Sequence, residues 1–210
     1  MASQEKERGR FITVEGIEGV GKSTNLGFVA NELRRAGHAV VETREPGGTG
    51  LGERIRELLL SPESKIEPLT ELLLMFAARA AHIDEVIRPA LGSGKWVVCD
   101  RFTDASHAYQ GGGRGLPSDA ISMLARLVQG DVHPDLTLLL DAPLAISAER
   151  QAGRGTRDRF EQESAAFYQR VRRAYLDLAA REPARIRLIN AARPLPEVQK
   201  DIRQVLTELD

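Results

Sequence analysis

The sequence predicts an α/β fold in which a five-stranded parallel sheet is covered by helices on both faces. Two observations carry this prediction. Five short apolar runs rich in β-branched residues are typical of buried strands, and longer segments with helical periodicity lie between them. Strands that alternate with helices of about ten or more residues form right-handed crossovers, which make the sheet parallel and cover both of its faces.

Each predicted strand is an apolar run, and each predicted helix repeats its apolar positions every three or four residues. The strands are expected at residues 11–14, 39–43, 96–99, 136–140 and 186–189. The helices are expected at residues 25–36, 71–91, 118–128, 144–151, 161–180 and 196–209. Because no linker or internal repeat divides the chain, we expect a flexible N-terminus at residues 1–9 and a single domain at residues 10–210.

Composition and charge exclude several classes of protein. The 210 residues suffice for one well-buried domain, and 42% hydrophobic with 28% charged residues argue against disorder and fibrous repeats. With 29 basic and 30 acidic residues, the net charge of −1 argues against a general nucleic-acid-binding surface. Arginine is nonetheless abundant, at 24 residues against 5 lysines.

Cysteine usage and hydropathy predict a cytoplasmic protein with no membrane partner. Cys99 is the single cysteine, so no internal disulfide can form, and the four histidines show no metal-ligand spacing. The charged N-terminus lacks the apolar core of a signal peptide. No apolar run approaches the ~18 residues needed to cross a bilayer.

The glycines are concentrated, since 13 of the 19 fall in residues 16–21, 47–52, 111–115 and 153–155. In a parallel α/β sheet, ligands bind where the strands end at their carboxyl edge. The first two glycine stretches follow predicted strands closely, and Asp100 directly follows another. We therefore expect the glycines to gather at one edge of the sheet, where the backbone approaches a ligand.

Residues 16–23 match the phosphate-binding pattern GxxxxGK[ST], with a predicted strand before it and a predicted helix after it. The glycines let successive N–H groups turn inward, and these donors and the positive end of the helix hold phosphate oxygens. Lys22 is expected to reach the β- and γ-phosphates, and the Ser23 hydroxyl to ligate Mg²⁺. The alternative is a glycine-rich turn with an incidental lysine, which the flanking strand and helix disfavour.

The remaining motifs favour phosphoryl transfer to a small acceptor. The chain lacks the Asn-Lys-x-Asp string of a GTPase and is shorter than most oligomeric ATPases. Phosphoryl transfer needs positive charge around the transferred group. Residues 150–159 hold four arginines and two glycines, a composition that is typical of a basic lid that closes over the site. The alternative is that these arginines form a solvated charged helix face. Asp100 is suited to orient Mg²⁺ or the acceptor and Arg101 to bind an acceptor phosphate, or the two form a structural ion pair.

Four motifs together resemble the bacterial thymidylate kinases, which convert dTMP to dTDP with ATP. They are residues 15–24 (EGIEGVGKST), 43–49 (TREPGGT), 100–115 (DRFTDASHAYQGGGRG) and 158–163 (DRFEQE). The resemblance covers nearly the whole chain, and the third motif is the most specific. It implies a P-loop NTPase fold with a short Arg-rich lid at about residues 150–160, ATP and Mg²⁺ as cofactors, and a homodimer packed through helices.

The resemblance also implies residue roles on the donor side. Lys22, Arg101, Glu18 and a lid arginine act in catalysis; Arg154 is favoured in the lid, with Arg150 and Arg159 as competitors. Ser23 and Asp100 serve the metal. Asn190 and Ala191 border the adenine, or their loop is a plain surface turn. The ATP-binding loop comprises Gly16, Ile17, Glu18, Gly19, Val20, Gly21, Lys22, Ser23 and Thr24.

On the acceptor side, the resemblance assigns nine positions and leaves one contact open. Glu18 accepts a hydrogen bond from the sugar 3′-hydroxyl, and Tyr109 lies where a 2′-hydroxyl would sit. The phosphate is surrounded by Arg56, Arg79 and Arg101, with Glu45 and Asp100 organising that site and the metal, and the thymine edges are read by Ser106 and Gln110. The thymine-stacking position is Met75 in this sequence and Phe76 follows it, so either side chain is expected against the base.

The implied reaction is in-line attack of a dTMP phosphate oxygen on the γ-phosphate of ATP. Because the acceptor is already an anion, no strong general base is required, and Lys22, Mg²⁺, Arg101 and a lid arginine neutralise the charge. One alternative is a kinase for another nucleoside monophosphate or a deoxynucleoside. Another is a nucleotide-dependent switch that hydrolyses ATP slowly, for which residues 100–115 have no evident use.

Overall fold

The computed structural model describes residues 8–152 and 158–209 and contains one five-stranded parallel sheet. The strand order is β2-β3-β1-β4-β5. All five strands lie where the apolar runs predict them, and the expected fold class is confirmed. Their bounds are β1 Phe11–Glu15, β2 Val40–Arg44, β3 Trp96–Asp100, β4 Leu136–Asp141 and β5 Ile186–Asn190.

Each strand continues one residue beyond the predicted apolar run. Backbone pairing extends to polar residues, because Val14 pairs with Asp100 and Asp141 pairs with Asn190. These last residues stand at the carboxyl edge of the sheet, where an α/β fold binds its ligands. The sheet below them is tightly packed, and all five residues of β1 are buried.

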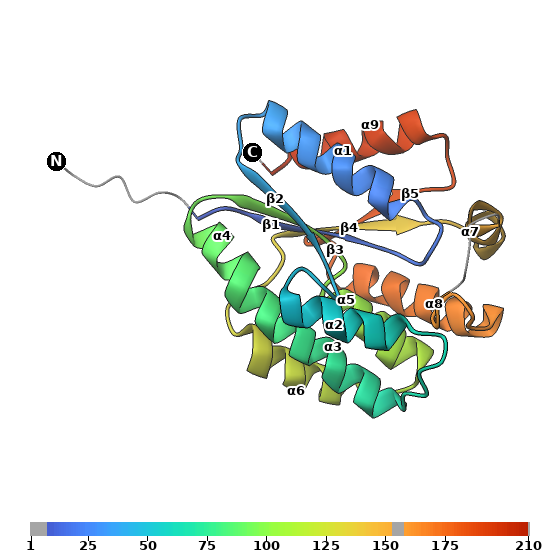
Figure 1. Cartoon of the computed structure of the whole chain (residues 1–210). Coiled ribbons are helices and arrows are strands. Elements are labelled where there is room, and N and C mark those ends of the chain that lie inside the picture. Colours follow the sequence, from blue (N-terminus) through green and yellow to red (C-terminus); the bar gives the residue numbers. More distant parts are fainter. Residues whose placement is uncertain (1–7, 153–157, 210) are drawn as a thin grey trace.

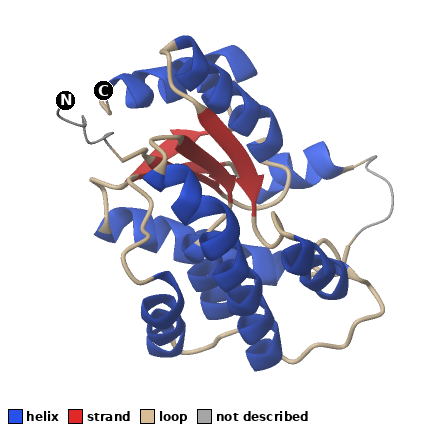
Figure 2. Cartoon of the chain, turned by 60° about the vertical axis from the view of Figure 1, so that its left-hand side comes forward, coloured by secondary structure: helices blue, strands red, loops and turns tan. Residues whose placement is uncertain are grey.

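Helices cover both faces of the sheet (Figure 1). One face carries α1 (Lys22–Arg35) and α9 (Leu195–Thr207), which contact each other. Most of the remaining helices lie on the opposite side, and Figure 2 shows the sheet in red between the two groups. Their bounds are α2 Gly50–Leu60, α3 Pro68–His82, η1 Ile83–Ile87, α4 Arg88–Gly92, α5 Thr103–Ser106, η2 His107–Gly113, α6 Ser118–Gln129, α7 Leu144–Gln151 and α8 Ala165–Arg181.

The helix expected at residues 71–91 differs from the observed one. It begins three residues earlier, at Pro68, whose fixed φ and missing N–H suit the first turn of a helix. It is also divided, since a turn of π-helix, η1, separates α3 from α4. Similarly, α8 begins at Ala165 rather than residue 161, because the Ser164 hydroxyl caps it by accepting from the Phe167 N–H.

Two helical segments, α2 and α5–η2, were missed by the sequence analysis because their glycines suggested loops. Gly50 and Gly52 lie in the first turn of α2. Gly112 and Gly113 lie in η2 and let α8 pack closely, since a Cβ on Gly113 would come within 2.5 Å of the Phe167 ring. These two glycines therefore serve the packing of η2 against α8.

In the part of the chain that the structure describes, no helix is long and apolar enough to cross a membrane.

Candidate active site

The phosphate-binding loop joins the end of β1 to the start of α1, as the motif predicts. Gly16, Gly19 and Gly21 have φ values of 135°, 79° and 93°, which favour glycine. Any side chain would also collide, because a Cβ on Gly16 would lie 2.4 Å from the Leu140 carbonyl oxygen and one on Gly19 would lie 2.3 Å from the Ser147 carbonyl oxygen. The close packing of this loop against β4 and α7 therefore fixes its shape.

Lys22 stands at the first position of α1 and folds back over this loop. Its Nζ donates to the Ile17 carbonyl oxygen at 2.9 Å. Burial, followed by the nearby charge of Arg101, lowers the pKa of Lys22 to about 8. Ser23 and Thr24 follow in the exposed first turn of the helix. The loop thus presents a cation and a helix N-terminus at the carboxyl edge of the sheet, an arrangement that binds phosphate.

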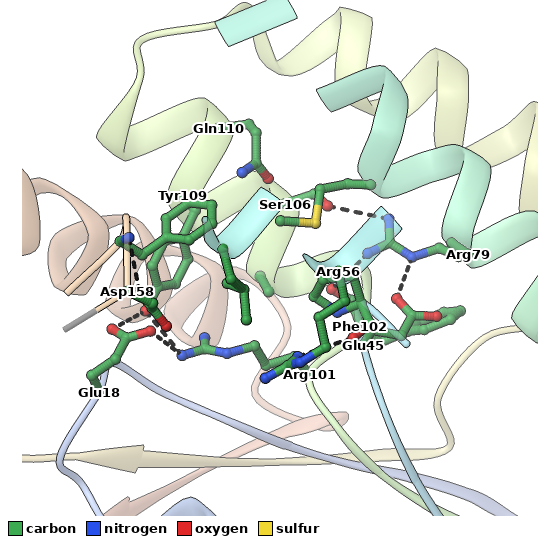
Figure 3. Close-up of a pocket in the computed structure, with 15 residues that line it drawn as sticks. Glu18, Glu45, Arg56, Arg79, Arg101, Phe102, Ser106, Tyr109, Gln110 and Asp158 are labelled. Carbon is green, nitrogen blue, oxygen red and sulfur yellow. Dashed lines mark hydrogen bonds and ion pairs between the residues drawn. The ribbon is translucent and has the colours of Figure 1, made fainter. Parts of the chain in front are cut away.

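Arg101 directly follows β3 and connects this loop with a neighbouring pocket (Figure 3). Its guanidinium donates to Glu18 Oε1 at 2.7 Å, to the Tyr109 hydroxyl at 3.1 Å and to the Tyr175 hydroxyl at 3.2 Å. Tyr109 donates in turn to Glu18 Oε2 at 2.6 Å. Burial alone would raise the pKa of Glu18, but Arg101 and Lys22 lower it below its usual value.

The backbone of Arg101 is in the left-handed region, with φ of 70°, and within the described ranges it is the one residue other than glycine with a positive φ. This conformation costs a residue with a Cβ roughly 1–2 kcal/mol. Glu15 holds the next residue in place, because its Oε1 accepts from the Phe102 N–H at 2.7 Å while its Oε2 accepts from Tyr175 at 2.7 Å. Burial, and then the charge of Asp104, raises the pKa of Glu15 to about 8.

The pocket beside Arg101 brings together nine of the eleven residues expected on the acceptor side, all except Asp100 and Phe76. Residues from the phosphate loop, α2, α3, α5 and η2 meet there, together with the segment that follows residue 157. Its lining comprises Glu18, Glu45, Pro46, Arg56, Leu60, Met75, Arg79, Arg101, Phe102, Ala105, Ser106, Tyr109, Gln110, Asp158 and Phe160.

Arg79, expected beside the acceptor phosphate, is buried and bonded to protein groups. It is 2% exposed and lies between the rings of Phe76 and Phe102. Its guanidinium donates to Glu45 Oε2 at 2.7 Å, to Ser106 Oγ at 3.2 Å and to the Phe102 carbonyl oxygen at 3.1 Å. Three protein acceptors thus hold Arg79 at the Ser106 side of the pocket (Figure 3).

Glu45 organises this side, since its second oxygen lies 3.0 Å from His82 Nδ1. Met75 lines the pocket, whereas Phe76 is buried with Leu72 and Ile121 beneath the Arg79 guanidinium. Of the two side chains expected against a base, the structure therefore brings Met75 to the pocket.

The opposite side of the pocket is cationic. Arg56 lines it and donates to the Pro46 carbonyl oxygen at 3.0 Å, and Arg101 lies beside it. Asp100 is the last residue of β3 and directly precedes Arg101, and its Oδ1 is buried without a hydrogen-bond partner among the described residues. A buried carboxylate oxygen without a partner fits a cation ligand, because it would otherwise be costly to desolvate.

The basic segment expected to form a lid is described only at its two ends. Arg154 lies outside the described residues. Arg150, in α7, donates to the Ala191 carbonyl oxygen at 2.8 Å. Arg159 donates to the Leu59 carbonyl oxygen at 2.8 Å and to Glu71 Oε2 at 2.6 Å. Both competitors of Arg154 are therefore engaged with the protein.

The loop after β5 contacts α7 and the end of β4. Ala191 is buried and its N–H donates to the Asp141 carbonyl oxygen at 2.8 Å, whereas Asn190 is exposed and its Oδ1 accepts from the Ala192 N–H. With the Arg150 contact, the loop and α7 form one border of the phosphate-loop region.

Sequence reasoning missed several residues of the site. Glu15 and Asp158 lie within the recognised motifs but had no role assigned to them. Their signal is their position, because Glu15 directly precedes the phosphate loop and Asp158 lies beside Arg159. Tyr175 and Glu71 lie in helices, where a tyrosine or glutamate gives no sequence signal of burial. Their roles depend on contacts between residues that are far apart in the sequence. Tyr175 contacts Glu15, 160 positions away, and Glu71 contacts Gln110, 39 positions away.

Comparisons with known proteins agree with this geometry. A family model described as thymidylate kinase matches residues 14–202. The chain is 57% identical over 202 residues to the thymidylate kinase of Pseudomonas syringae pv. tomato, covering 96% of each chain. It is 55% identical over 204 residues to that of Ectopseudomonas mendocina, again with 96% of each covered.

A solved structure agrees as well. The crystal structure of thymidylate kinase from Ehrlichia chaffeensis superimposes with a TM-score of 0.78 at 35% identity, covering 95% of this chain and 99% of that one. With a phosphate loop, an adjoining pocket and relatives matched over nearly their full length, this chain belongs to the thymidylate kinase family.

Proposed function

We propose that the chain transfers the γ-phosphate of ATP to dTMP, giving dTDP and ADP. The observation that carries this proposal is the position of Arg101, which bonds to Glu18 of the phosphate loop and lines the adjoining pocket. A donor site and an acceptor site therefore share one cation. Phosphoryl transfer between two anions requires positive charge at that junction, since charge gathers there in the transition state.

On the donor side, backbone N–H groups of residues 16–24 bind the ATP phosphates and Lys22 contributes the charge of its ammonium. Asn190 and Ala191 border the adenine. Mg²⁺, when bound, neutralises phosphate charge, and Ser23 and Asp100 would hold it; the unpartnered Asp100 Oδ1 supports this assignment.

On the acceptor side, the charge distribution of the pocket orients dTMP. Arg56 and Arg101 bind the 5′-phosphate because they form its cationic side. Glu18 accepts from the sugar 3′-hydroxyl, and Tyr109, held against Glu18 and Arg101, occupies the space of a 2′-hydroxyl.

The thymine lies at the Arg79 side. Because Arg79 is fixed by Glu45, Ser106 and Phe102, we assign it to the base rather than to the phosphate. Met75 packs on the ring, and Ser106 and Gln110 face its polar edge.

The acceptor phosphate attacks in line and needs no general base. Lys22 and Arg101 stabilise the charge that develops between the two phosphates, and binding holds the reacting groups in position. Arg154 supplies the further charge from the lid, since Arg150 and Arg159 are engaged elsewhere.

The chain forms a homodimer in the cytoplasm. Three neighbouring helices, α2, α3 and α6, carry large apolar side chains that are exposed in one chain. They are Leu51, Leu58, Leu69, Leu73, Met123 and Leu127. Burying them against a second copy stabilises the pair, because a fully buried leucine contributes roughly 1.5–3 kcal/mol. The buried free thiol of Cys99 is compatible with a reducing compartment.

The Lys22→Ala variant tests the donor site. Loss of the ammonium removes charge stabilisation from the transferred group, so kcat for dTMP phosphorylation should fall about 10³-fold or more, with an unchanged thermal unfolding midpoint. Lys200, which is exposed on α9, provides the matched control: Lys200→Ala should retain activity.

Coupled assays with dTMP, dUMP, dCMP and thymidine identify the acceptor. Full activity of Lys22→Ala, or thymidine as the best acceptor, contradicts the proposal.

The lowered pKa of Lys22 predicts how ATP affinity depends on pH. Only the protonated ammonium attracts phosphate, so ATP binding raises this pKa and takes up a proton when the pH exceeds about 8. The Kd for ATP should therefore rise as pH increases above that value, approaching tenfold per pH unit. Calorimetry in buffers of different ionisation enthalpy measures the proton uptake, and Lys22→Arg should abolish it. The titration of Lys22 spans roughly pH 7 to 9.5. A Kd for ATP that stays constant over this range in the native chain argues against a role of the Lys22 ammonium in ATP binding.

The apolar surface on α6 predicts the oligomeric state. Sedimentation should give the native chain twice its mass of 23.1 kDa, and Leu127→Glu should yield monomers because it buries a charge in the interface. Leu188→Glu, at an exposed position of β5, is the control and should remain dimeric. A native chain that sediments as a monomer would refute the dimer.

A further inference from the structure

The structure contains a buried carboxylate, Glu71, to which the proposed mechanism gives no role. It lies in the first turn of α3 and is 0% exposed. Arg159 donates to its Oε2 at 2.6 Å, and Arg114 donates to the same oxygen at 3.1 Å. Two guanidiniums therefore pair with this carboxylate, and Arg114 also pairs with Glu163; these ion pairs make the burial of Glu71 tolerable.

The remaining oxygen of Glu71 holds a pocket residue. Gln110 Nε2 donates to Glu71 Oε1 at 2.8 Å. A carboxylate paired with two guanidiniums can only accept hydrogen bonds, so the Gln110 amide must turn its nitrogen toward it. The opposite orientation would bring two oxygens together. Glu71 thereby decides which end of the Gln110 amide faces the pocket.

The end that faces the pocket is the carbonyl oxygen. Gln110 is 1% exposed and lines the pocket, and within the described residues its Oε1 accepts no hydrogen bond. Figure 3 shows the amide above Tyr109 and Ser106, with its oxygen on the Ser106 side. An acceptor that faces the pocket from a nearly buried side chain, with no partner among the described residues, points to a ligand that donates at this position.

Arg79 lines the same pocket and carries further donors. Three of the five N–H groups of its guanidinium are bonded to Glu45, Ser106 and Phe102, which leaves one on each terminal nitrogen. The wall of the pocket thus offers donors from Arg79 and an acceptor from Gln110. Thymine presents the complementary pattern, an O4 acceptor beside an N3–H donor. Cytosine presents the reverse, an N4 amine beside an N3 lone pair.

We propose that Glu71 is a positioning residue that makes the pocket select a pyrimidine with an N3–H group and reject cytosine. The inference rests on the proposed function, because it assigns the base end of the dTMP site. By fixing the Gln110 amide, Glu71 keeps an acceptor opposite N3. A cytosine there leaves both Arg79 and Gln110 facing like groups, and such unpaired polar contacts discriminate strongly.

The Glu71→Gln variant tests this inference. An amide at position 71 can donate as well as accept, so Gln110 is free to turn its NH₂ group toward the pocket. The ratio of kcat/KM for dTMP to that for dCMP should fall at least about tenfold. Glu71→Gln also removes the negative charge that pairs with Arg114 and Arg159, which destabilises the fold. If this variant does not fold, Glu71→Asp is used instead, because it keeps the charge but withdraws the carboxylate from Gln110. Glu71→Asp should lower the same ratio.

A Gln110→Met background separates positioning from a merely structural role. With no amide to orient, adding Glu71→Gln should leave the dTMP to dCMP ratio as it is in Gln110→Met alone. Equal loss of activity toward both substrates, with the ratio unchanged by Glu71→Gln or Glu71→Asp in the native background, would overturn the inference while dTMP phosphorylation stands. A native chain without activity on dTMP would instead reject the proposed function and the inference with it.

Discussion

The bond between Arg101 and Glu18 is the interaction on which the site depends, because it joins the phosphate loop to the acceptor pocket. Arg101 adopts a left-handed backbone conformation that a residue with a side chain avoids. The surrounding structure maintains it through Glu15, which accepts the next N–H, and through Tyr175, which contacts both Glu15 and the guanidinium. The strain stored at this position places one cation at the junction of the phosphate loop and the pocket, where we propose that the two phosphates meet.

The same principle, an arginine held by a buried carboxylate, recurs around the pocket. Glu45 fixes Arg79 at the Ser106 side of the pocket, and Glu71 binds Arg114 and Arg159 behind Gln110. Together with the pair of Glu18 and Arg101, these pairs engage four of the 24 arginines around the pocket. Charge in this molecule is organised locally, because carboxylates hold the guanidiniums in place around the pocket.

The sheet and the phosphate loop could be predicted from sequence because both depend on local patterns. Apolar runs identified all five strands, and the spacing of Gly16, Gly21 and Lys22 identified the loop. The helices α2 and α5–η2 were missed, because glycines in a sequence usually indicate loops. In η2, however, glycine is required by close packing, as Gly113 lies against Phe167. The position of Arg79 depends on Glu45, 34 residues away, and no local pattern encodes such a pairing.

The kinetics of Arg101→Ala test the central claim most directly, because this side chain is assigned to both halves of the site. If Arg101 stabilises the charge between donor and acceptor, the variant should lose about tenfold to 10³-fold in kcat with dTMP and ATP, while native mass spectrometry or circular dichroism shows a folded chain. Activity within about twofold of the native chain would contradict the account, because the loss of one donor to the transition state lowers the rate by far more than that.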